Sequence, residues 1–361
     1  MTRPVRQVVV VGAEASAWLA AASLLKAMRH RQLEVTVVDG GHGVAPCGYS
    51  TLPSQRGIHA LLGISEVELI RRTAATFKLA SEHVGWRGEG SRFLHVHGEI
   101  GAEVSGTPFF KYLQLQAISG KPEDPAQYSV AALAARNARF ARPMGDDKSL
   151  TAAFTYGYHL EESAYRDFVR AHALAMGVKR VTAAVGDVNF AEDGNIYSLR
   201  LASGEWIPGD LFLDCSGSGG VLASRLGDER EDWSAWLPCD RQLSGRAAPM
   251  ADPPAVTRTL AHAAGWRWTA PLANASMTGL VYGSAFQSDD AAAEQLRGLA
   301  PGLVDMRLSR FRSGRRAARL LRGPPAGARA CPARRGAPRL LGGGLARRYR
   351  SRARMVQAPS P

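Results

Sequence analysis

A glycine turn near the N-terminus carries residue types that can bind a dinucleotide. The β-branched run Val8–Val11 leads into Gly12-Ala13-Glu14-Ala15-Ser16-Ala17. In such turns the first glycine makes the tight bend, the second lets backbone amides approach a pyrophosphate, and the third lets the helix pack on the strand. Gly12 keeps the first role and Ala17 suits the third, but Glu14 brings a negative charge to the second. This turn alone leaves two alternatives open: a weakened dinucleotide site, or a packed unit that binds nothing.

Two acidic residues at predicted strand ends favour the first alternative. Asp39 ends the stretch LEVTVVD, at a position where an acidic side chain can bind a ribose hydroxyl. Asp214 ends the stretch DLFLD and is followed by the small residues CSGSGG, which include Gly217. Such a turn can hold the ribityl chain and pyrophosphate of a flavin, because the aspartate binds a hydroxyl and the glycines leave room. Two sites of this kind in one chain favour FAD over NAD.

The elements that would position these residues define an α/β fold class. Val8–Val11 and LEVTVVD are typical of buried parallel strands, and residues 15–31 between them are helix formers. The N-terminus is therefore predicted to be a Rossmann-like βαβ module. Residues 58–85 are expected to be helical, as are a stretch after the loop 121–129 and a stretch from about Glu161. Turn signals after about residue 186 indicate a mixed β region as well.

The excess positive charge lies at the C-terminal end of the chain. The 361 residues carry a net charge of +13, and residues 314–361 contain 13 Arg with no Lys, Asp or Glu, so residues 1–313 are neutral. This tail is rich in Arg, Ala, Gly and Pro, shows no apolar period and is expected to be disordered. Three explanations stay open: a shifted reading frame in a GC-rich gene, a basic arm that binds nucleic acid, and an ordinary solvated tail. Nothing outside the tail suggests nucleic acid.

Membrane, disulfide and metal proteins are poor matches to this sequence. It contains no apolar run of about 18 residues, so we expect no membrane span. The four cysteines are scattered and form no Cys-x-x-Cys pair, which fits a reducing cytoplasm rather than a disulfide framework or a zinc site. His95 and His97 could share one strand face, but no third ligand is evident, and no metal site is predicted.

Several segments occur in an order typical of one enzyme family. VVVVGAEASAWLAA stands where that family has a glycine-rich turn followed by Gly-Trp, and Trp18 keeps the tryptophan. GYSTLP at 48–53 resembles Gly-Glu-x-Thr-x-Pro, with Tyr49 in place of glutamate. TFKLASEHVGW at 76–86 resembles the segment of a catalytic lysine, and GWRWTAPL at 265–272 resembles Trp-x-Trp-x-Ile-Pro. From Gln7 to about Arg316 the chain thus resembles the flavin-dependent tryptophan halogenases, within the flavoprotein monooxygenase group.

The resemblance implies a cofactor, partners and a reaction. Family members use FAD, reduced by a separate flavin reductase, to convert chloride or bromide to hypohalous acid, which halogenates an electron-rich aromatic such as tryptophan or indole. It implies Lys78 as the catalytic residue, because a primary amine can be N-halogenated or can direct a hydrogen bond. The chain has 6 Lys against 39 Arg, so a cation needed only for solubility would more readily have been arginine. A surface lysine on an amphipathic helix is the alternative.

The site residues predicted from the turns and from the resemblance form two further groups. The cofactor-binding group consists of Gly12, Ala13, Ala15, Ala17, Asp39, Ser50, Thr51, Asp214 and Gly217. The group that shields the substrate side consists of Trp266, Trp268 and Pro271. Ordinary core packing is the alternative for the two tryptophans.

We expect one halogenase-like module over residues 1–313. FAD-binding segments are predicted at about 1–57 and 150–225, and substrate-side segments at about 58–149 and 226–313. The C-terminal part of the family fold is expected to be missing, and with it the family's glutamate that works with the lysine. A catalytically inactive truncated paralogue and a flavin-dependent aromatic hydroxylase are therefore kept as alternatives. Whether the protein forms a homodimer stays open.

Overall fold

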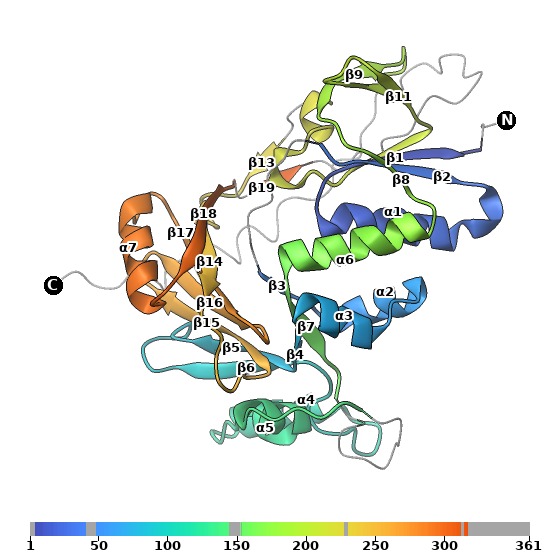
Figure 1. Cartoon of the computed structure of the whole chain (residues 1–361). Coiled ribbons are helices and arrows are strands. Elements are labelled where there is room, and N and C mark those ends of the chain that lie inside the picture. The colour runs from blue at the N-terminus through green and yellow to red at the C-terminus, as the bar shows by residue number, and fades with distance from the viewer. Residues whose placement is uncertain are drawn as a thin grey trace, which may run out of the picture. The chain divides into compact units, whose positions relative to one another are not determined.

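The computed structural model describes residues 4–40, 48–143, 152, 154–226, 230–311 and 314–316. All of these belong to one compact unit, Pro4–Pro324 (Figure 1). The Arg-rich tail predicted to be disordered lies outside the described residues, except for residues 314–316. In the part of the chain that is described, no helix is long and apolar enough to cross a membrane.

A four-stranded parallel sheet forms the N-terminal module, in the order β12-β1-β2-β8. Its strands are β1 (Gln7–Val11), β2 (Glu34–Val38), β8 (Lys179–Val181) and β12 (Leu211–Asp214). The predicted βαβ module is confirmed, because α1 (Ala15–Ala27) and the short 3₁₀ helix η1 (Arg29–Arg31) connect β1 to β2. The helix α6 (Glu162–Ala175) lies beside α1 (Figure 1), where Trp18 is fully buried. One face of β1 therefore packs on helices.

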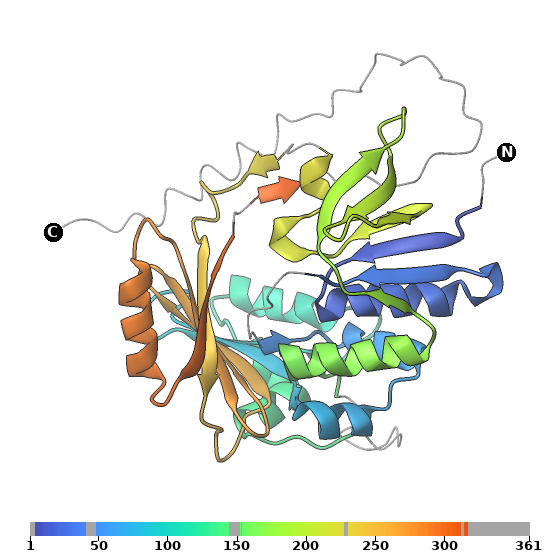
Figure 2. The ribbon, with the colours of Figure 1, turned by 45° about the horizontal axis from the view of Figure 1, so that its top comes forward.

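A small antiparallel sheet covers the other face of β1 (Figure 2). It is formed by β9 (Val185–Phe190), β10 (Ile196–Leu201) and β11 (Trp206–Pro208). Val9 and Val11 pack with Ile196, Leu199 and Phe212 on this side, whereas Val8 and Val10 pack toward the helices. Burial of both faces explains why β1 is apolar at every position after Gln7.

A three-stranded antiparallel sheet, in the order β3-β7-β4, positions the central residues of the site. Its strands are β3 (Gly48–Ser50), β7 (Gly157–Glu161) and β4 (Thr76–Lys78). The prediction of one helical stretch over 58–85 is wrong in its second half: α2 (Ser54–Leu62) and α3 (Glu66–Thr73) are followed by β4 and by β5 (Ala80–Val84). The chain turns at Ala74, which has a φ of 52°, and the next residues pair with β7 and β6 instead of extending the helix.

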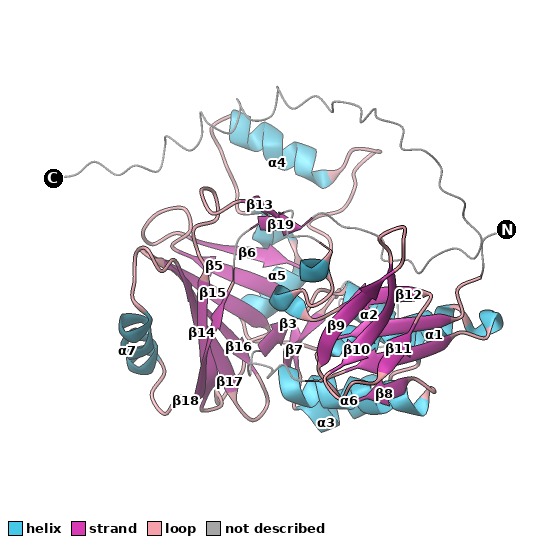
Figure 3. Ribbon diagram, turned by 90° about the horizontal axis from the view of Figure 1, so that it is seen from above, coloured by secondary structure: helices cyan, strands magenta, loops and turns pink. Residues whose placement is uncertain are grey.

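A seven-stranded sheet joins two distant parts of the sequence (Figure 3). Its order is β18-β14-β17-β16-β15-β5-β6. The strands not yet given are β6 (Arg92–Val96), β14 (Arg241–Ala247), β15 (Val256–His262), β16 (Gly265–Pro271), β17 (Ser276–Tyr282) and β18 (Val304–Arg310). The predicted substrate-side segments 58–149 and 226–313 thus share one sheet, although their assignment to substrate remains a prediction.

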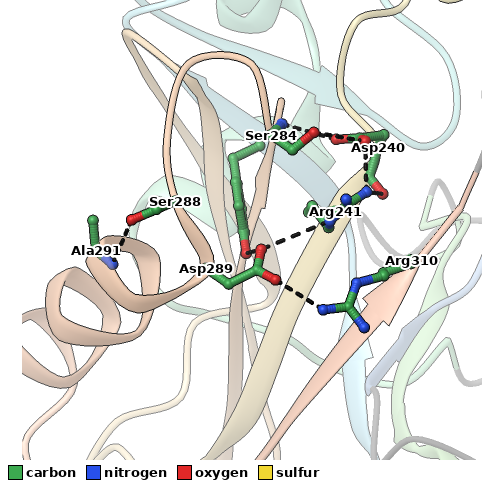
Figure 4. Close-up of polar contacts among 8 residues, drawn as sticks. Asp240, Arg241, Ser284, Ser288, Asp289, Ala291 and Arg310 are labelled. Atoms are coloured by element: carbon green, nitrogen blue, oxygen red, sulfur yellow. Dashed lines mark hydrogen bonds and ion pairs between the residues drawn. The ribbon is translucent and has the colours of Figure 1, made fainter.

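Polar contacts connect the helix α7 (Asp289–Leu299) to this sheet (Figure 4). The residues that form them, here called the polar clamp, are Asp240, Arg241, Tyr282, Ser284, Asp289 and Arg310. The Tyr282 hydroxyl donates to Asp289 over 2.7 Å, and Arg310 donates to the other oxygen of that carboxylate over 3.0 Å. Asp240 pairs with Arg241 over 2.5 Å and accepts two hydrogen bonds from Ser284. The clamp connects β14, β17 and β18 at the start of α7.

Shorter elements complete the described part of the chain. The remaining helices are α4 (Phe109–Ile118) and α5 (Val130–Arg136), and β13 (Arg230–Asp232) pairs with β19 (Gly314–Arg316). Three 3₁₀ turns lie at Pro125–Tyr128, Gly217–Gly219 and Ala223–Arg225. The helix α5 packs three alanines into the core, whereas α4 buries none of its residues.

Candidate functional site

The two predicted glycine turns meet at one edge of the parallel sheet. The carboxyl ends of β1 and β12 are adjacent, with Val11 paired to Asp214. Gly12 follows with a φ of 152°, and a Cβ at this position would lie 2.3 Å from the carbonyl oxygen of Cys215. Glycine is therefore required at position 12 because the backbones of two strand ends approach closely. Such an edge, with strands on both sides of β1, is where α/β proteins bind nucleotides.

The helix that leaves this turn presents a negative charge beside its amides. Glu14 is the N-cap residue of α1, in extended conformation, and its side chain makes no capping hydrogen bond. Its Oε1 lies 3.7 Å from the position that a Cβ of Gly217 would take, so the carboxylate projects between the two turns. A helix N-terminus attracts anions, and the Glu14 carboxylate between the two turns opposes the approach of a phosphate to it. Ala15 and Ala17 are buried beneath it.

The two predicted aspartates differ in their remaining hydrogen-bonding capacity. The Asp39 side chain is only 3% exposed and pairs with Arg180 over 2.8 Å, while its Oδ1 has no partner among the described residues. A buried carboxylate oxygen without a donor suits a ribose hydroxyl. Asp214 instead accepts four hydrogen bonds, from Ser216, Leu222 and Ala223. It thereby shapes the second turn, and its contact with a ribityl hydroxyl remains a prediction.

A buried acid–phenol pair lies beside this edge. Tyr49 donates its hydroxyl to Glu162 over 3.0 Å, and Glu162 is only 4% exposed. Burial, with the neighbouring Glu14 second in importance, raises the pKa of Glu162 to about 7. The sequence showed Tyr49 only as a departure from a motif, and it gave no signal for Glu162. The residues of this edge fit a dinucleotide at Gly12 and Asp39, with two nearby carboxylates that oppose its charge.

Lys78 lies in the interior rather than on an exposed helix face. It is the last residue of β4, opposite Gly157, and it is 4% exposed. Burial lowers the pKa of its amine from 10.5 to about 8. The amine of Lys78 makes no hydrogen bond or ion pair within the described residues, so no carboxylate there stabilises its charge. A substantial fraction of the amine is consequently neutral near pH 8, which a nucleophilic amine requires.

The charge of this amine acts on two buried histidines, His159 and His97. Burial, with the charge of Lys78 second in importance, lowers the pKa of His159 to about 3 and that of His97 to about 4. His159 is wholly buried, and the Nε2 atom of His97 has no partner among the described residues. His95 is exposed while His97 is buried. The part of the chain that is described contains no group of three metal-ligating side chains.

Ser50 and Thr51, both predicted to bind cofactor, make different contacts. Thr51 extends the pairing of β3 with β7, because its Oγ1 accepts from the Tyr158 amide over 2.8 Å. Ser50 is an exposed residue, and its hydroxyl lies 2.5 Å from the hydroxyl of Thr257 on β15. Ser50 therefore connects the three-stranded sheet to the seven-stranded one. Thr257 and its partner His159 are site residues that the sequence analysis did not identify.

The two predicted shielding tryptophans, Trp266 and Trp268, both lie on β16 but have different neighbours. Trp266 stacks obliquely on Trp86, with ring centroids 5.6 Å apart. The Trp268 indole covers Gly279, where a Cβ would lie 2.8 Å from its Nε1. Pro271 ends β16 and accepts a hydrogen bond from Thr76 at its carbonyl oxygen. Their shielding role remains a prediction.

A parallel sheet with a glycine turn at its carboxyl edge, joined to a mixed sheet with a buried amine nearby, defines a Rossmann-like α/β protein. Comparison with known families identifies it further, because the family described as Tryptophan halogenase matches residues 7–323. The chain therefore belongs to the tryptophan halogenase family.

Individual relatives agree with this assignment. Tryptophan 6-halogenase ThaL of Streptomyces albogriseolus is 30% identical, over 87% of this chain and 63% of its own length. Tryptophan 7-halogenase RebH of Lentzea aerocolonigenes is 29% identical, with the same coverage of 87% and 63%. Among solved structures, the flavin-dependent halogenase BrvH from Brevundimonas sp. BAL3 matches with a TM-score of 0.78 and 34% identity, over 86% of this chain and 64% of BrvH. The chain thus spans slightly less than two thirds of the length of these relatives.

Proposed function

We propose that the protein is an FAD-dependent halogenase that acts on an electron-rich aromatic of the tryptophan or indole type. The observation that carries the proposal is the buried, unpaired amine of Lys78 in a chain of this family. A buried amine without a counter-ion is unfavourable, so its retention in the interior requires a chemical reason.

The glycine turns and Asp39 would hold the cofactor. Gly12 lets the ends of β1 and β12 approach closely at the edge where a pyrophosphate would lie, and the free Oδ1 of Asp39 would accept from a ribose hydroxyl. When bound, reduced FAD supplies the electrons with which oxygen and chloride or bromide form hypohalous acid. A separate flavin reductase would supply the reduced cofactor. The two tryptophans would exclude the aromatic substrate from the flavin side.

Lys78 would hold the oxidised halogen. Its neutral amine attacks the halogen of hypohalous acid, an N–halogen bond forms, the halogen–oxygen bond breaks, and the displaced hydroxide takes the amine proton to give water. The aromatic carbon then takes the halogen as the N–halogen bond breaks, the same carbon loses its proton, and the nitrogen regains one, which restores the amine. A hydrogen bond from the same amine to intact hypohalous acid would position the halogen equally. The first role depends on the burial of Lys78, because an ammonium has no lone pair with which to attack the halogen, whereas the hydrogen-bonding role is open to the amine and to the ammonium.

The proposal is tested by product analysis with purified protein. Wild type is supplied with FAD, NADH, a flavin reductase, bromide and tryptophan or indole, and the product is identified by mass spectrometry. We expect a brominated aromatic, which is lost in Lys78→Met and kept in the matched control Lys26→Met, since Lys26 is exposed on α1. A hydroxylated product, or bromination that survives Lys78→Met, would contradict the proposal.

FAD binding can be tested separately from catalysis, because the Glu14 carboxylate at the N-terminus of α1 would repel the pyrophosphate of the cofactor. Replacement by glycine removes the carboxylate and restores the small residue, so FAD binding to Glu14→Gly is expected to be roughly fivefold tighter than to wild type. The dissociation constant is obtained from flavin fluorescence quenching. Failure of both proteins to bind FAD would exclude a flavin reaction for this chain.

A further inference from the structure

A continuous chain of hydrogen bonds crosses from the three-stranded sheet to the end of β16. Ser50 lies 2.5 Å from Thr257, and Thr257 lies 3.0 Å from Nε2 of His159. Nδ1 of His159 lies 3.0 Å from the hydroxyl of Thr76, which donates to the carbonyl of Pro271 over 2.5 Å. Four side chains and one carbonyl thus connect β3, β15, β7, β4 and β16.

The last member of this chain sets the direction of every bond. A carbonyl oxygen can only accept, so Thr76 uses its single hydroxyl hydrogen on Pro271. The oxygen of Thr76 must then accept from Nδ1 of His159, which carries the proton. In a neutral imidazole the other nitrogen is an acceptor, so Thr257 donates to Nε2 and in turn accepts from Ser50.

The neutral state of His159 follows from its surroundings. The ring is wholly buried, and burial lowers the pKa of His159 to about 3. The charged or titratable groups that act on it are Lys78 and His97, and both disfavour a second proton. An imidazolium would donate from both nitrogens and would allow Thr257 to donate to Ser50, which is the opposite direction.

Ser50, at the exposed end, has therefore used its only hydrogen. It lies between Tyr49 and Thr51, and Ser50 and Thr51 both belong to the cofactor-binding group predicted from the sequence; Ser50 is an exposed residue. We propose that His159 is a positioning residue which, through Thr257, fixes the Ser50 hydroxyl as a hydrogen-bond acceptor, so that Ser50 binds an N–H or O–H donor of the flavin. This inference rests on the proposed function and specifies that, in the contact between Ser50 and the flavin, the protein accepts the hydrogen bond and the flavin donates it. The chain ends at a carbonyl, so it polarises Ser50 but carries no proton onward to Lys78.

The orientation is tested without any flavin. Protein labelled with ¹⁵N-histidine is examined by long-range ¹H–¹⁵N correlation spectra, in which the two neutral tautomers and the imidazolium differ. The signals of His159 are assigned as those absent from His159→Gln. We expect the Nδ1–H tautomer, unchanged between about pH 5.5 and 9. The Nε2–H tautomer, or protonation within this range, would overturn the proposal.

A variant of nearly the same shape distinguishes an effect of the hydrogen-bond direction on His159 from an effect of side-chain packing. Thr76→Val removes the acceptor of Nδ1–H and keeps the shape of the side chain. We expect the His159 signals to move to a mixture of tautomers or to Nε2–H, while those of exposed histidines such as His30 stay in place. An unchanged Nδ1–H tautomer in this variant would show that Thr76 does not set the direction.

The contact with the cofactor is tested by FAD affinity. Ser50→Ala removes the acceptor and is expected to weaken FAD binding roughly fivefold, whereas the matched control Ser54→Ala, four residues along the same segment, leaves it unchanged. Equal affinity of Ser50→Ala and wild type would overturn the role of Ser50 while leaving the proposed function intact. If wild type does not bind FAD, the proposed function and this contact would both be refuted. The tautomer measurement would then still report the direction of the hydrogen bonds from Ser50 to Pro271.

Discussion

Replacing Lys78 by methionine should make the protein more stable at neutral pH. The amine is 4% exposed and has no partner within the described residues, so folding removes its charge from water without compensation. Methionine has a similar length, is flexible and carries no charge, so it can fill the same space without that cost.

The expected size follows from the change in pKa between the unfolded and folded chain. The lowering from 10.5 to about 8 corresponds to about 3 kcal/mol of lost stability when the amine is protonated in the unfolded state. When folding lowers the pKa of a group, the folded protein has its full stability at pH values above the pKa of the unfolded chain. That stability is lost as the pH falls through the pKa of the folded protein. The gain from Lys78→Met should therefore be close to zero near pH 10.5, grow down to about pH 8, and stay near 3 kcal/mol below that.

Urea unfolding of both proteins, followed by tryptophan fluorescence near pH 7, 9 and 10.5, provides the measurement. Lys26→Met is the matched control, and because Lys26 is exposed its stability should differ from that of wild type by no more than about 0.5 kcal/mol. A Lys78→Met protein that is less stable than wild type near pH 7, or one whose gain does not change with pH, would refute the claim that an uncompensated buried charge is present at this position.

Three further perturbations test other parts of the structure. Burial raises the pKa of Glu162 from 4.5 to about 7, so this group contributes its full stability below pH 4.5 and loses it as the pH rises through about 7. Glu162→Gln should therefore raise the free energy of unfolding by about 3 kcal/mol near pH 8 and leave it unchanged near pH 4, as measured by urea unfolding. Gly12→Ala places a Cβ 2.3 Å from the Cys215 carbonyl and should lower the free energy of unfolding by about 2 kcal/mol, with a lower melting temperature. Tyr282→Phe removes the donor to Asp289 and should cost about 1 kcal/mol in the same assay, and an unchanged value would show that the clamp adds no stability.

Features that depend on neighbours in the sequence were predicted well. The βαβ module follows from β-branched runs on either side of helix formers, and the structure has β1, α1 and β2 in those places. The strand ending at Lys78 was missed because apolar residues are frequent throughout 58–85, and a three-residue strand has too few positions to show an alternating pattern. Its strand character comes from β7, which lies about 80 residues further along the chain.

The polar contacts of the site could not be predicted, because distant strands supply them. The chain from Ser50 through Thr257 and His159 exists only once β3, β15 and β7 are side by side. Serine, threonine and histidine are ordinary residues in strands, so no local pattern distinguishes these three. Glu162 is similar, since the two largest causes of its raised pKa are burial and Glu14, which is distant in the sequence.

The strand order has a consequence for the synthesis of the protein. In the parallel sheet Val8 pairs with Leu211, and in the seven-stranded sheet Ala80 pairs with Val256. A growing chain on the ribosome therefore carries β1 and β5 with one edge unpaired until more than half of its residues have been made, and contacts of such long range form slowly. The edge where Gly12 meets Cys215 exists only after β12 has joined β1, so the FAD contact proposed for that edge can form only late in folding. Because segments from both halves of the chain contribute to the parallel sheet and to the seven-stranded sheet, expression of either half alone is expected to yield exposed strand edges and aggregation instead of a separate folded domain.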